Sequence, residues 1–220
     1  MPVQFEPLAL GVWMHTSYLD TEQWGPVASN GLLVTTPWGL LLVDTAWTEK
    51  DTRAILDWTE SRLGQSVTAA VLTHAHQDKM GGVRALRERG IPSWAHRLSN
   101  EAAPGESLLP ADHDLVLRDG MQPLAGTMVY YPGPAHTRDN VVVYVPQARL
   151  LFGGCTVRPA RARTLGNTAD ADVGYWDRAV NNILTRFPEA ETVVPSHGPP
   201  GGLGLLEGTI ALVDAHRQQE

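Results

Sequence analysis

The chain has 220 residues, which fits one large domain or two small ones. It carries 17 Lys and Arg residues against 24 Asp and Glu residues, and this net charge of −7 disfavours a nucleic-acid binder or a protein that binds anionic membranes. Hydrophobic residues make up 43% of the chain, which is a globular composition. No apolar run approaches the roughly 20 residues of a membrane span, and the N-terminal residues show no signal peptide. We expect a monomer with no nucleic-acid partner and no membrane span.

The first half of the chain predicts a strand hairpin, a helix and a buried strand. Apolar runs at 31–36 and 40–43 indicate the hairpin, which ends at Asp44. Residues 51–63 keep apolar side chains at helical spacing and stop before a glycine. A buried strand over 67–73 follows and runs directly into a pair of histidines.

The second half predicts the same order of elements. A hairpin over 141–152 leads into two glycines and Cys155, the single cysteine of the chain. A helix is expected over 175–187, and a strand over 192–194 that leads to His197. This alternation of strands and helices is typical of an α/β or α+β domain.

The two halves therefore place comparable residues at comparable positions. Asp44 and Cys155 follow the hairpins, and His74 and His197 follow the later strands. A turn-rich stretch around 104–123 joins the halves. We expect two packed sheets with outer helices, with these four strand ends at one edge.

His74 and His76 lie two residues apart at the end of a buried strand. In an extended segment, residues i and i+2 point to one side and lie roughly 6.6 Å apart, so both imidazoles can approach one zinc ion. Asp78 continues this period. Three further residues with zinc-binding side chains follow a strand or a glycine turn: His136, Cys155 and His197.

These six residues predict a divided metal site, although strand-end histidines near solvent are the simpler alternative for the His-x-His pair alone. One zinc ion would bind His74, His76 and His136, and the other would bind Asp78, Cys155 and His197. Three protein ligands leave each ion with an open position, which is typical of catalytic zinc and not of structural zinc.

The motif at residues 73–82, THAHQDKMGG, resembles the signature of the metallo-β-lactamase superfamily. Lys79 stands where the glyoxalase, ribonuclease and third-subclass lactamase branches carry a histidine, and Cys155 is a ligand that those branches lack. Both residues indicate the first subclass of the class B β-lactamases. The chain is similar to the New Delhi-type enzymes of this subclass from about Phe5 to Pro199, most clearly in the segments 15–20, 27–31, 43–48 and 165–167.

The resemblance implies a four-layer αββα sandwich of two similar halves, in one domain over residues 1–220. It implies a periplasmic enzyme that holds two Zn²⁺ ions and opens the amide bond of penicillins, cephalosporins and carbapenems, which gives antibiotic resistance. A metal-bound hydroxide would attack the lactam carbonyl, and Asp78 would orient it. Asn167 and one zinc ion would stabilise the oxyanion, while the other zinc ion would hold the departing nitrogen.

The resemblance also implies roles in substrate binding. Arg158 stands where the family usually has a lysine for the substrate carboxylate, and it offers a bidentate fork instead. Trp24 and Trp47 would be apolar walls for the substrate, with Trp24 on a flap whose tip, residues 21–23, is more polar than in similar enzymes. The simpler alternative for both is an ordinary core or surface tryptophan.

Two further residues are expected to support the ligands. Asp44 would fix a ligand from behind, with a structural turn as the alternative. Lys79 would screen the negative charge of Asp78 and of the Cys155 thiolate. The remaining histidines have no partner ligands at a useful spacing and are expected to be structural or solvated: His15, His96, His113 and His216.

Two other functions are compatible with the same residues. One is another hydrolase of the superfamily, acting on thioesters or lactones with weak lactamase activity. The other is a metal-binding or redox-sensing protein that uses Cys155 as its switch and has no turnover.

Overall fold

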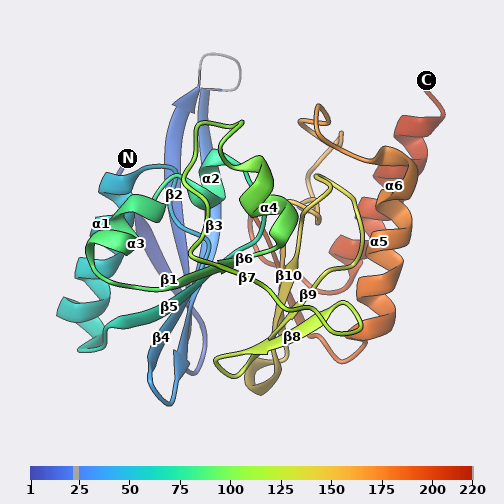
Figure 1. Ribbon diagram of the computed structural model, residues 1–220. Helices are drawn as coiled ribbons and strands as arrows, with labels where there is room; N and C mark the ends of the chain where they lie inside the picture. The colour runs from blue at the N-terminus through green and yellow to red at the C-terminus, as the bar shows by residue number, and fades with distance from the viewer. Residues whose placement is uncertain (22–24, 220) are drawn as a thin grey trace. The chain divides into compact units, whose positions relative to one another are not determined.

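The structure, a computed structural model, describes residues 1–21 and 25–219. It divides into two compact units, Met1–Val116 and Leu117–Glu220 (Figure 1). The boundary lies inside the turn-rich stretch 104–123 that the sequence indicates as the join between two halves. Within the described residues, no helix combines the length and the apolar character that crossing a bilayer requires.

The first unit is built on a seven-stranded sheet whose strands follow chain order from one edge to the other. The first four strands pair antiparallel and the later ones pair parallel. The strands are β1 (Gln4–Ala9), β2 (Val12–Thr21), β3 (Gly25–Thr36), β4 (Gly39–Val43), β5 (Val67–Leu72), β6 (Ser93–Ala95) and β7 (His113–Asp114). The predicted hairpin and buried strand are β3, β4 and β5. The strands β1, β2, β6 and β7 were not predicted; β1, for example, contains a proline and does not keep a regular alternation of polar and apolar residues.

Helices α1 and α3 lie on one face of this sheet (Figure 1). The helices of the unit are α1 (Glu49–Trp58), which continues as a π-helical turn (Thr59–Leu63), α2 (Gln77–Met80), α3 (Val83–Glu88) and α4 (Arg97–Ala102). The Thr48 hydroxyl caps α1 by accepting the Asp51 backbone N–H, and Gly64 ends the π-helical turn in the left-handed conformation. Ile55 of α1 and Leu86 of α3 pack into one apolar cluster with residues of β3, β4 and β5.

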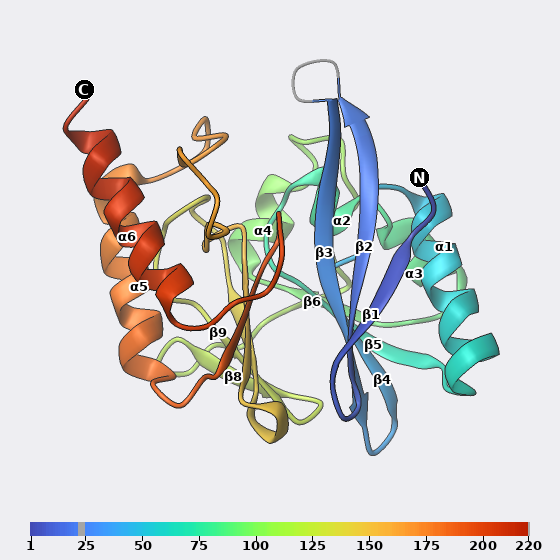
Figure 2. The same cartoon turned by 180° about the vertical axis from the view of Figure 1, so that it is seen from behind.

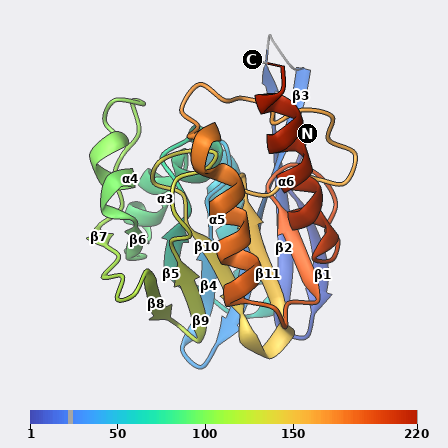
Figure 3. The same ribbon diagram turned by 90° about the vertical axis from the view of Figure 1, so that its right-hand side faces the viewer.

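The second unit is a five-stranded sheet in the order β12-β11-β10-β9-β8. Its strands are β8 (Met121–Leu124), β9 (Thr127–Tyr130), β10 (Val142–Val145), β11 (Leu150–Gly154) and β12 (Thr192–Pro195), with a 3₁₀ turn (Pro146–Ala148) between β10 and β11. Helices α5 (Val173–Arg186) and α6 (Gly204–Arg217) lie side by side over this sheet (Figures 2 and 3). Trp176 of α5 and Leu206 of α6 pack in one cluster with Leu151 and Val193 of the strands.

Each unit contains one pair of parallel neighbouring strands that carries the residues of interest at its end. In the first unit β4 and β5 are paired, with Val43 opposite Val71. In the second unit β11 and β12 are paired, with Gly154 opposite Pro195. Because parallel neighbours end at the same edge of a sheet, the residues that follow the two strands of a pair are brought together.

The glycine pair after the His-x-His motif is required by close packing. A Cβ on Gly82 would lie 1.9 Å from the Thr52 Oγ1 atom, and one on Gly81 would lie 2.3 Å from the Trp47 carbonyl oxygen. The Thr52 hydroxyl also accepts the Ala46 backbone N–H, so it is not free to move away. The glycines thus let the chain after the motif pack against the start of α1.

We predict that Gly82→Ala destabilises the protein by about 1–3 kcal/mol, the usual effect of overpacking. The matched control is Gly208→Ala in α6, where an added Cβ meets no atom within 4 Å. This control should stabilise the protein by about 0.5–1 kcal/mol, because alanine is the better helix former. Urea unfolding of both variants without metal measures the difference, and equal effects would contradict the packing explanation.

Candidate metal centre

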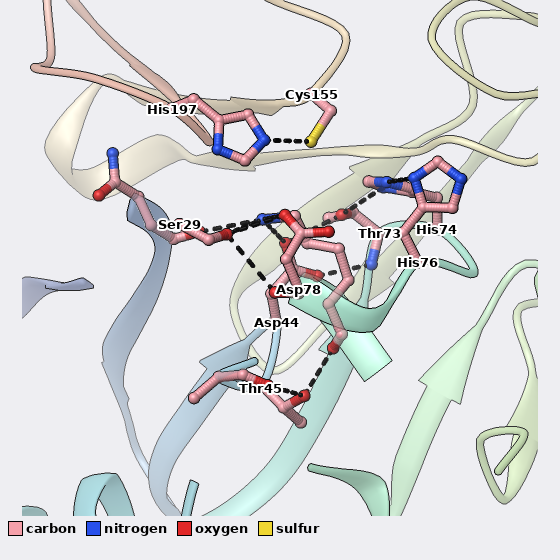
Figure 4. A network of polar contacts seen from close by, with 12 residues as sticks. Ser29, Asp44, Thr45, Thr73, His74, His76, Asp78, Cys155 and His197 are labelled. Carbon is pink, nitrogen blue, oxygen red and sulfur yellow. Dashed lines mark hydrogen bonds and ion pairs between the residues drawn. The ribbon is translucent and has the colours of Figure 1, made fainter. Parts of the chain in front are cut away.

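His74, His76 and Asp78 of the first unit converge (Figure 4), but not through one extended segment: β5 ends at Leu72, His76 precedes helix α2, and Asp78 lies in the first turn of α2. Their ligand atoms all lie within 4.8 Å of one another, and His74 Nε2 is 3.2 Å from His76 Nδ1. His74 and Asp78 are buried and His76 is partly exposed. Two imidazole nitrogens and a carboxylate oxygen form a donor set that suits zinc.

Asp44 is linked to His74 through the side chain of Thr73, which contacts both residues. Asp44 follows β4 with a φ of 61° and is fully buried. Its carboxylate accepts two hydrogen bonds from Thr73, one from the backbone N–H at 2.7 Å and one from the hydroxyl at 2.9 Å. The same hydroxyl oxygen lies 3.3 Å from His74 Nδ1. Burial raises the pKa of Asp44 to about 6, although the nearby Lys79 ammonium opposes this shift.

Lys79 is fully buried between two carboxylates of the first unit. Its Nζ lies 3.0 Å from Asp78 Oδ2 and 3.6 Å from Asp44 Oδ2, and it donates to the Ser29 hydroxyl at 2.8 Å. The Ser29 hydroxyl in turn donates to Asp78 Oδ2 at 2.9 Å. One ammonium beside two carboxylates leaves an excess of negative charge when both are ionised, which favours a bound cation. This direct contact supports the prediction that the Lys79 ammonium screens the negative charge of Asp78.

Cys155 and His197 of the second unit also meet, with Sγ 3.4 Å from Nε2 (Figure 4). Cys155 is buried and His197 partly exposed. Cys155 directly follows β11 and His197 follows β12 by one residue, so the parallel pair brings them together. A thiol and an imidazole are again zinc donors.

His136 lies in a loop of the second unit that Trp176 and Asn140 support. The His136 ring packs edge-on against the indole of Trp176, at 5.9 Å between ring centres. The same indole N–H donates to the carbonyl of Thr156, the neighbour of Cys155, at 2.8 Å. Asn140 spans the loop, because its side chain accepts the Thr137 N–H and donates to a backbone carbonyl at the other end.

Of the substrate-binding residues predicted from the resemblance, Arg158 and Asn167 belong to the second unit, where Arg158 Nη2 lies 3.0 Å from the position of a Cβ on Gly166, the neighbour of Asn167. Arg158 lines a cavity of about 300 Å³ beside α6, and burial lowers its pKa. Asn167 is exposed, and its side-chain oxygen accepts the Ala169 N–H. Trp47 is half-buried, and Trp24 lies outside the described residues. Their proposed roles toward a substrate remain predictions.

His15 belongs to the structure rather than to the ligand set, as expected. It is fully buried on β2, and its Nε2 lies 3.2 Å from the Asp44 carbonyl oxygen. Burial, together with the positive charge of Lys79, lowers its pKa to about 4. His15 is therefore neutral at pH 7 and supports the turn that carries Asp44.

Sequence reasoning missed four of the supporting residues: Ser29, Thr73, Asn140 and Trp176. Only Thr73 has a local signal, since it directly precedes the His-x-His pair. Ser29 and Trp176 are identified by contacts between distant parts of the chain, such as the sequence separation of 49 between Ser29 and Asp78. Asn140 is identified by hydrogen bonds within its own loop.

Comparison with known proteins gives consistent matches over nearly the whole chain. The sequence model of the metallo-beta-lactamase superfamily matches residues 24–197 of this chain. The chain is 39% identical over 215 residues to a metallo-beta-lactamase type 2 of Bacillus sp. (strain 170), which covers 96% of this chain and 82% of that protein. A metallo-beta-lactamase type 2 of Pseudomonas aeruginosa is 32% identical over 207 residues, covering 94% and 82%.

Solved structures agree with these sequence matches. The metallo-beta-lactamase FIM-1 from Pseudomonas aeruginosa, in its mono-zinc form, matches with a TM-score of 0.95 and 46% identity, covering 98% of this chain and 96% of that one. A metallo-beta-lactamase from Hirschia baltica matches with a TM-score of 0.94 and 40% identity, covering 97% and 98%. The predicted fold class and the resemblance read from the motifs are both confirmed.

We predict a specific pH dependence of stability from His15. The unfolded chain protonates this imidazole near its ordinary pKa of 6.5, whereas the folded protein keeps it neutral down to about pH 4. The unfolded state therefore binds more protons in this window, so stability is lost as the pH falls from 6.5 to 4, by about 3 kcal/mol for this group. Asp44, with its raised pKa, has the opposite effect between about pH 6 and 3.8.

The contribution of His15 is isolated by comparing two proteins that share Asp44 and all other titratable groups, because the effects of the shared groups then cancel. We compare the free energy of unfolding of the metal-free protein with that of His15→Gln, whose amide can still donate to the Asp44 carbonyl. The advantage of the original protein over the variant should shrink by about 3 kcal/mol from pH 7 to pH 4. Thr59→Val, which removes a buried hydroxyl and no titratable group, is the control and should show a constant difference. A constant difference for His15→Gln as well would refute the prediction.

Proposed function

The chain belongs to the metallo-β-lactamase superfamily and is a hydrolase of that class, and we propose that it opens the β-lactam ring of penicillins, cephalosporins and carbapenems with two zinc ions. The observation that carries the proposal is the convergence of His74, His76 and Asp78 in a chain with this family membership. The similar FIM-1 enzyme was solved in a mono-zinc form, which supports zinc as the metal here.

The proposal assigns three ligands to each zinc ion. His74, His76 and His136 would hold one zinc ion, and Asp78, Cys155 and His197 would hold the other. Two arrangements within the units support this assignment: the close ligand atoms of the His74 group and the 3.4 Å contact of Cys155 with His197. Six donors shared by two ions leave positions for water and substrate.

Bound zinc would supply a water molecule of lowered pKa and a Lewis acid for the oxyanion. The residues of the chain would orient the attacking water and stabilise the oxyanion. The Ser29 hydroxyl and the Lys79 ammonium hold Oδ2 of Asp78, so this carboxylate presents a fixed oxygen to the attacking water. Asn167 would donate a hydrogen bond to the oxyanion as it forms.

The substrate would be held by groups away from the metal ligands. Arg158 would bind the substrate carboxylate through its guanidinium, the part of the side chain that can form two parallel hydrogen bonds. Trp24 and Trp47 would cover the apolar part of the antibiotic. The proposal further takes the protein to be a periplasmic monomer, a single domain whose activity gives antibiotic resistance.

The test is β-lactam hydrolysis as a function of bound metal. One penicillin, one cephalosporin and one carbapenem are followed by absorbance with the purified enzyme, after chelation, and after zinc is restored. Activity should disappear on chelation and return fully at two zinc ions per chain, as counted by elemental analysis. Full activity at one ion would refute the two-zinc part of the proposal alone.

A pair of histidine variants tests the ligand assignment. His136→Ala should bind one zinc ion fewer, and its kcat/KM should fall by at least roughly 100-fold. Loss of a residue that only supports a ligand lowers activity by about 10–100-fold, so a larger loss indicates a ligand. His113→Ala, an exposed histidine outside the proposed set, should keep both metal content and activity. An enzyme that binds zinc and cleaves thioesters or lactones but no β-lactam would contradict the proposed substrate.

A further inference from the structure

We infer that Thr73 and Asp44 form a positioning relay that holds the proton of His74 on Nδ1 and keeps the Nε2 lone pair available for metal. This inference rests on the proposed function only in taking His74 as a metal ligand. Its geometry lies entirely within the first unit of the chain (Figure 4). Thr73 has no other assigned role.

The direction of each hydrogen bond follows from the carboxylate. An ionised carboxylate only accepts, so the Thr73 hydroxyl proton must point to Asp44 Oδ2, at 2.9 Å. The hydroxyl oxygen then keeps lone pairs but has no proton left to donate. Since His74 Nδ1 lies 3.3 Å from this oxygen, Nδ1 is the donor in that contact.

The opposite side of the ring faces the proposed ligand atoms. His74 Nε2 lies 3.2 Å from His76 Nδ1, within the group completed by Asp78. A neutral imidazole carries one proton, so a proton held on Nδ1 leaves Nε2 as the metal-binding atom. The relay therefore selects the tautomer that metal binding requires.

Burial and backbone contacts hold the relay in place. Asp44, Thr73 and His74 are each at most 1% exposed, so water does not replace the Thr73 hydroxyl. The backbone N–H of Asp44 donates to the Val71 carbonyl at 2.9 Å, and the Thr73 N–H donates to Asp44 Oδ1 at 2.7 Å. Lys79, 3.6 Å from Asp44 Oδ2, stabilises the charged carboxylate.

The first test measures the His74 tautomer directly in the metal-free protein. Long-range ¹⁵N–¹H NMR distinguishes Nδ1–H from Nε2–H, and the signals of His74 are those missing in His74→Gln. The original protein should show the Nδ1–H form at pH 8. A predominant Nε2–H form in the original protein would overturn the inference.

Substitutions at Thr73 then separate the hydroxyl from the packing. Thr73→Val keeps the shape and removes the hydroxyl, so the tautomer preference should be lost and zinc affinity should fall about 10–100-fold, as measured by competition with a chelator. Thr73→Ser restores a hydroxyl and should restore both readouts. Thr59→Val removes another fully buried hydroxyl of the same unit, which donates to the Leu56 carbonyl, and should leave both readouts unchanged.

For Asp44→Asn we predict the opposite position of the proton on the His74 ring. Asparagine tolerates the left-handed conformation at this position, so the backbone is preserved. Its side-chain oxygen can still accept the Thr73 N–H, but its NH₂ group must donate to the Thr73 hydroxyl and turn that proton toward His74 Nδ1. His74 should therefore shift to the Nε2–H form, with weaker zinc binding.

The outcomes separate this inference from the proposed function. Unchanged tautomer and unchanged zinc affinity in both Thr73→Val and Asp44→Asn would overturn the relay, whatever the enzyme hydrolyses. If the tautomer responds as expected while the original protein hydrolyses no β-lactam, the relay stands and the proposed substrate is wrong.

Discussion

The arrangement of the first unit depends on a fully buried ammonium placed between two carboxylates. Lys79 contacts Asp78 and Asp44, and none of the three is appreciably exposed. A buried charge of this kind is tolerated only when it is paired and hydrogen-bonded, and loss of one partner is strongly destabilising. Asp78 Oδ2 is therefore held by the Lys79 ammonium and the Ser29 hydroxyl. The same ion group supports Asp44, whose carboxylate reaches His74 through Thr73.

Parallel strand pairs provide the second constraint, and each unit uses one. After β4 and β5, Asp44 meets Thr73. After β11 and β12, the Ser196 N–H donates to the Gly154 carbonyl and Cys155 meets His197. Backbone hydrogen bonds at the strand ends hold these side chains, so their positions do not depend on flexible loops. His136 is the exception, since a loop carries it, and there Trp176 and Asn140 supply the rigidity.

The proposed ligands and the residues that support them differ in side-chain chemistry. Carboxylates, imidazoles and a thiol stand in the proposed ligand positions. Hydroxyls contact two of these side chains directly, while an amide and an indole N–H bond the backbone next to others. Each of these neutral groups has a defined donor or acceptor role that determines where a proton lies. The chemistry of the proposed ligands is thus set by neighbours that do not touch the metal themselves.

The sequence by itself determined the ligand candidates and most of the elements that carry them. The residue types and short spacing of His74, His76 and Asp78 indicated a shared site, and helical spacing predicted α1 and α5, because these signals are local. The extended geometry expected for the three ligands was wrong for Asp78, which lies in α2. Only the tertiary structure decided that Lys79 is buried rather than at the surface, and that Ser29, 50 residues away, is its partner. Serine and threonine are common and have no characteristic spacing, so their roles arise only when folding brings distant segments into contact.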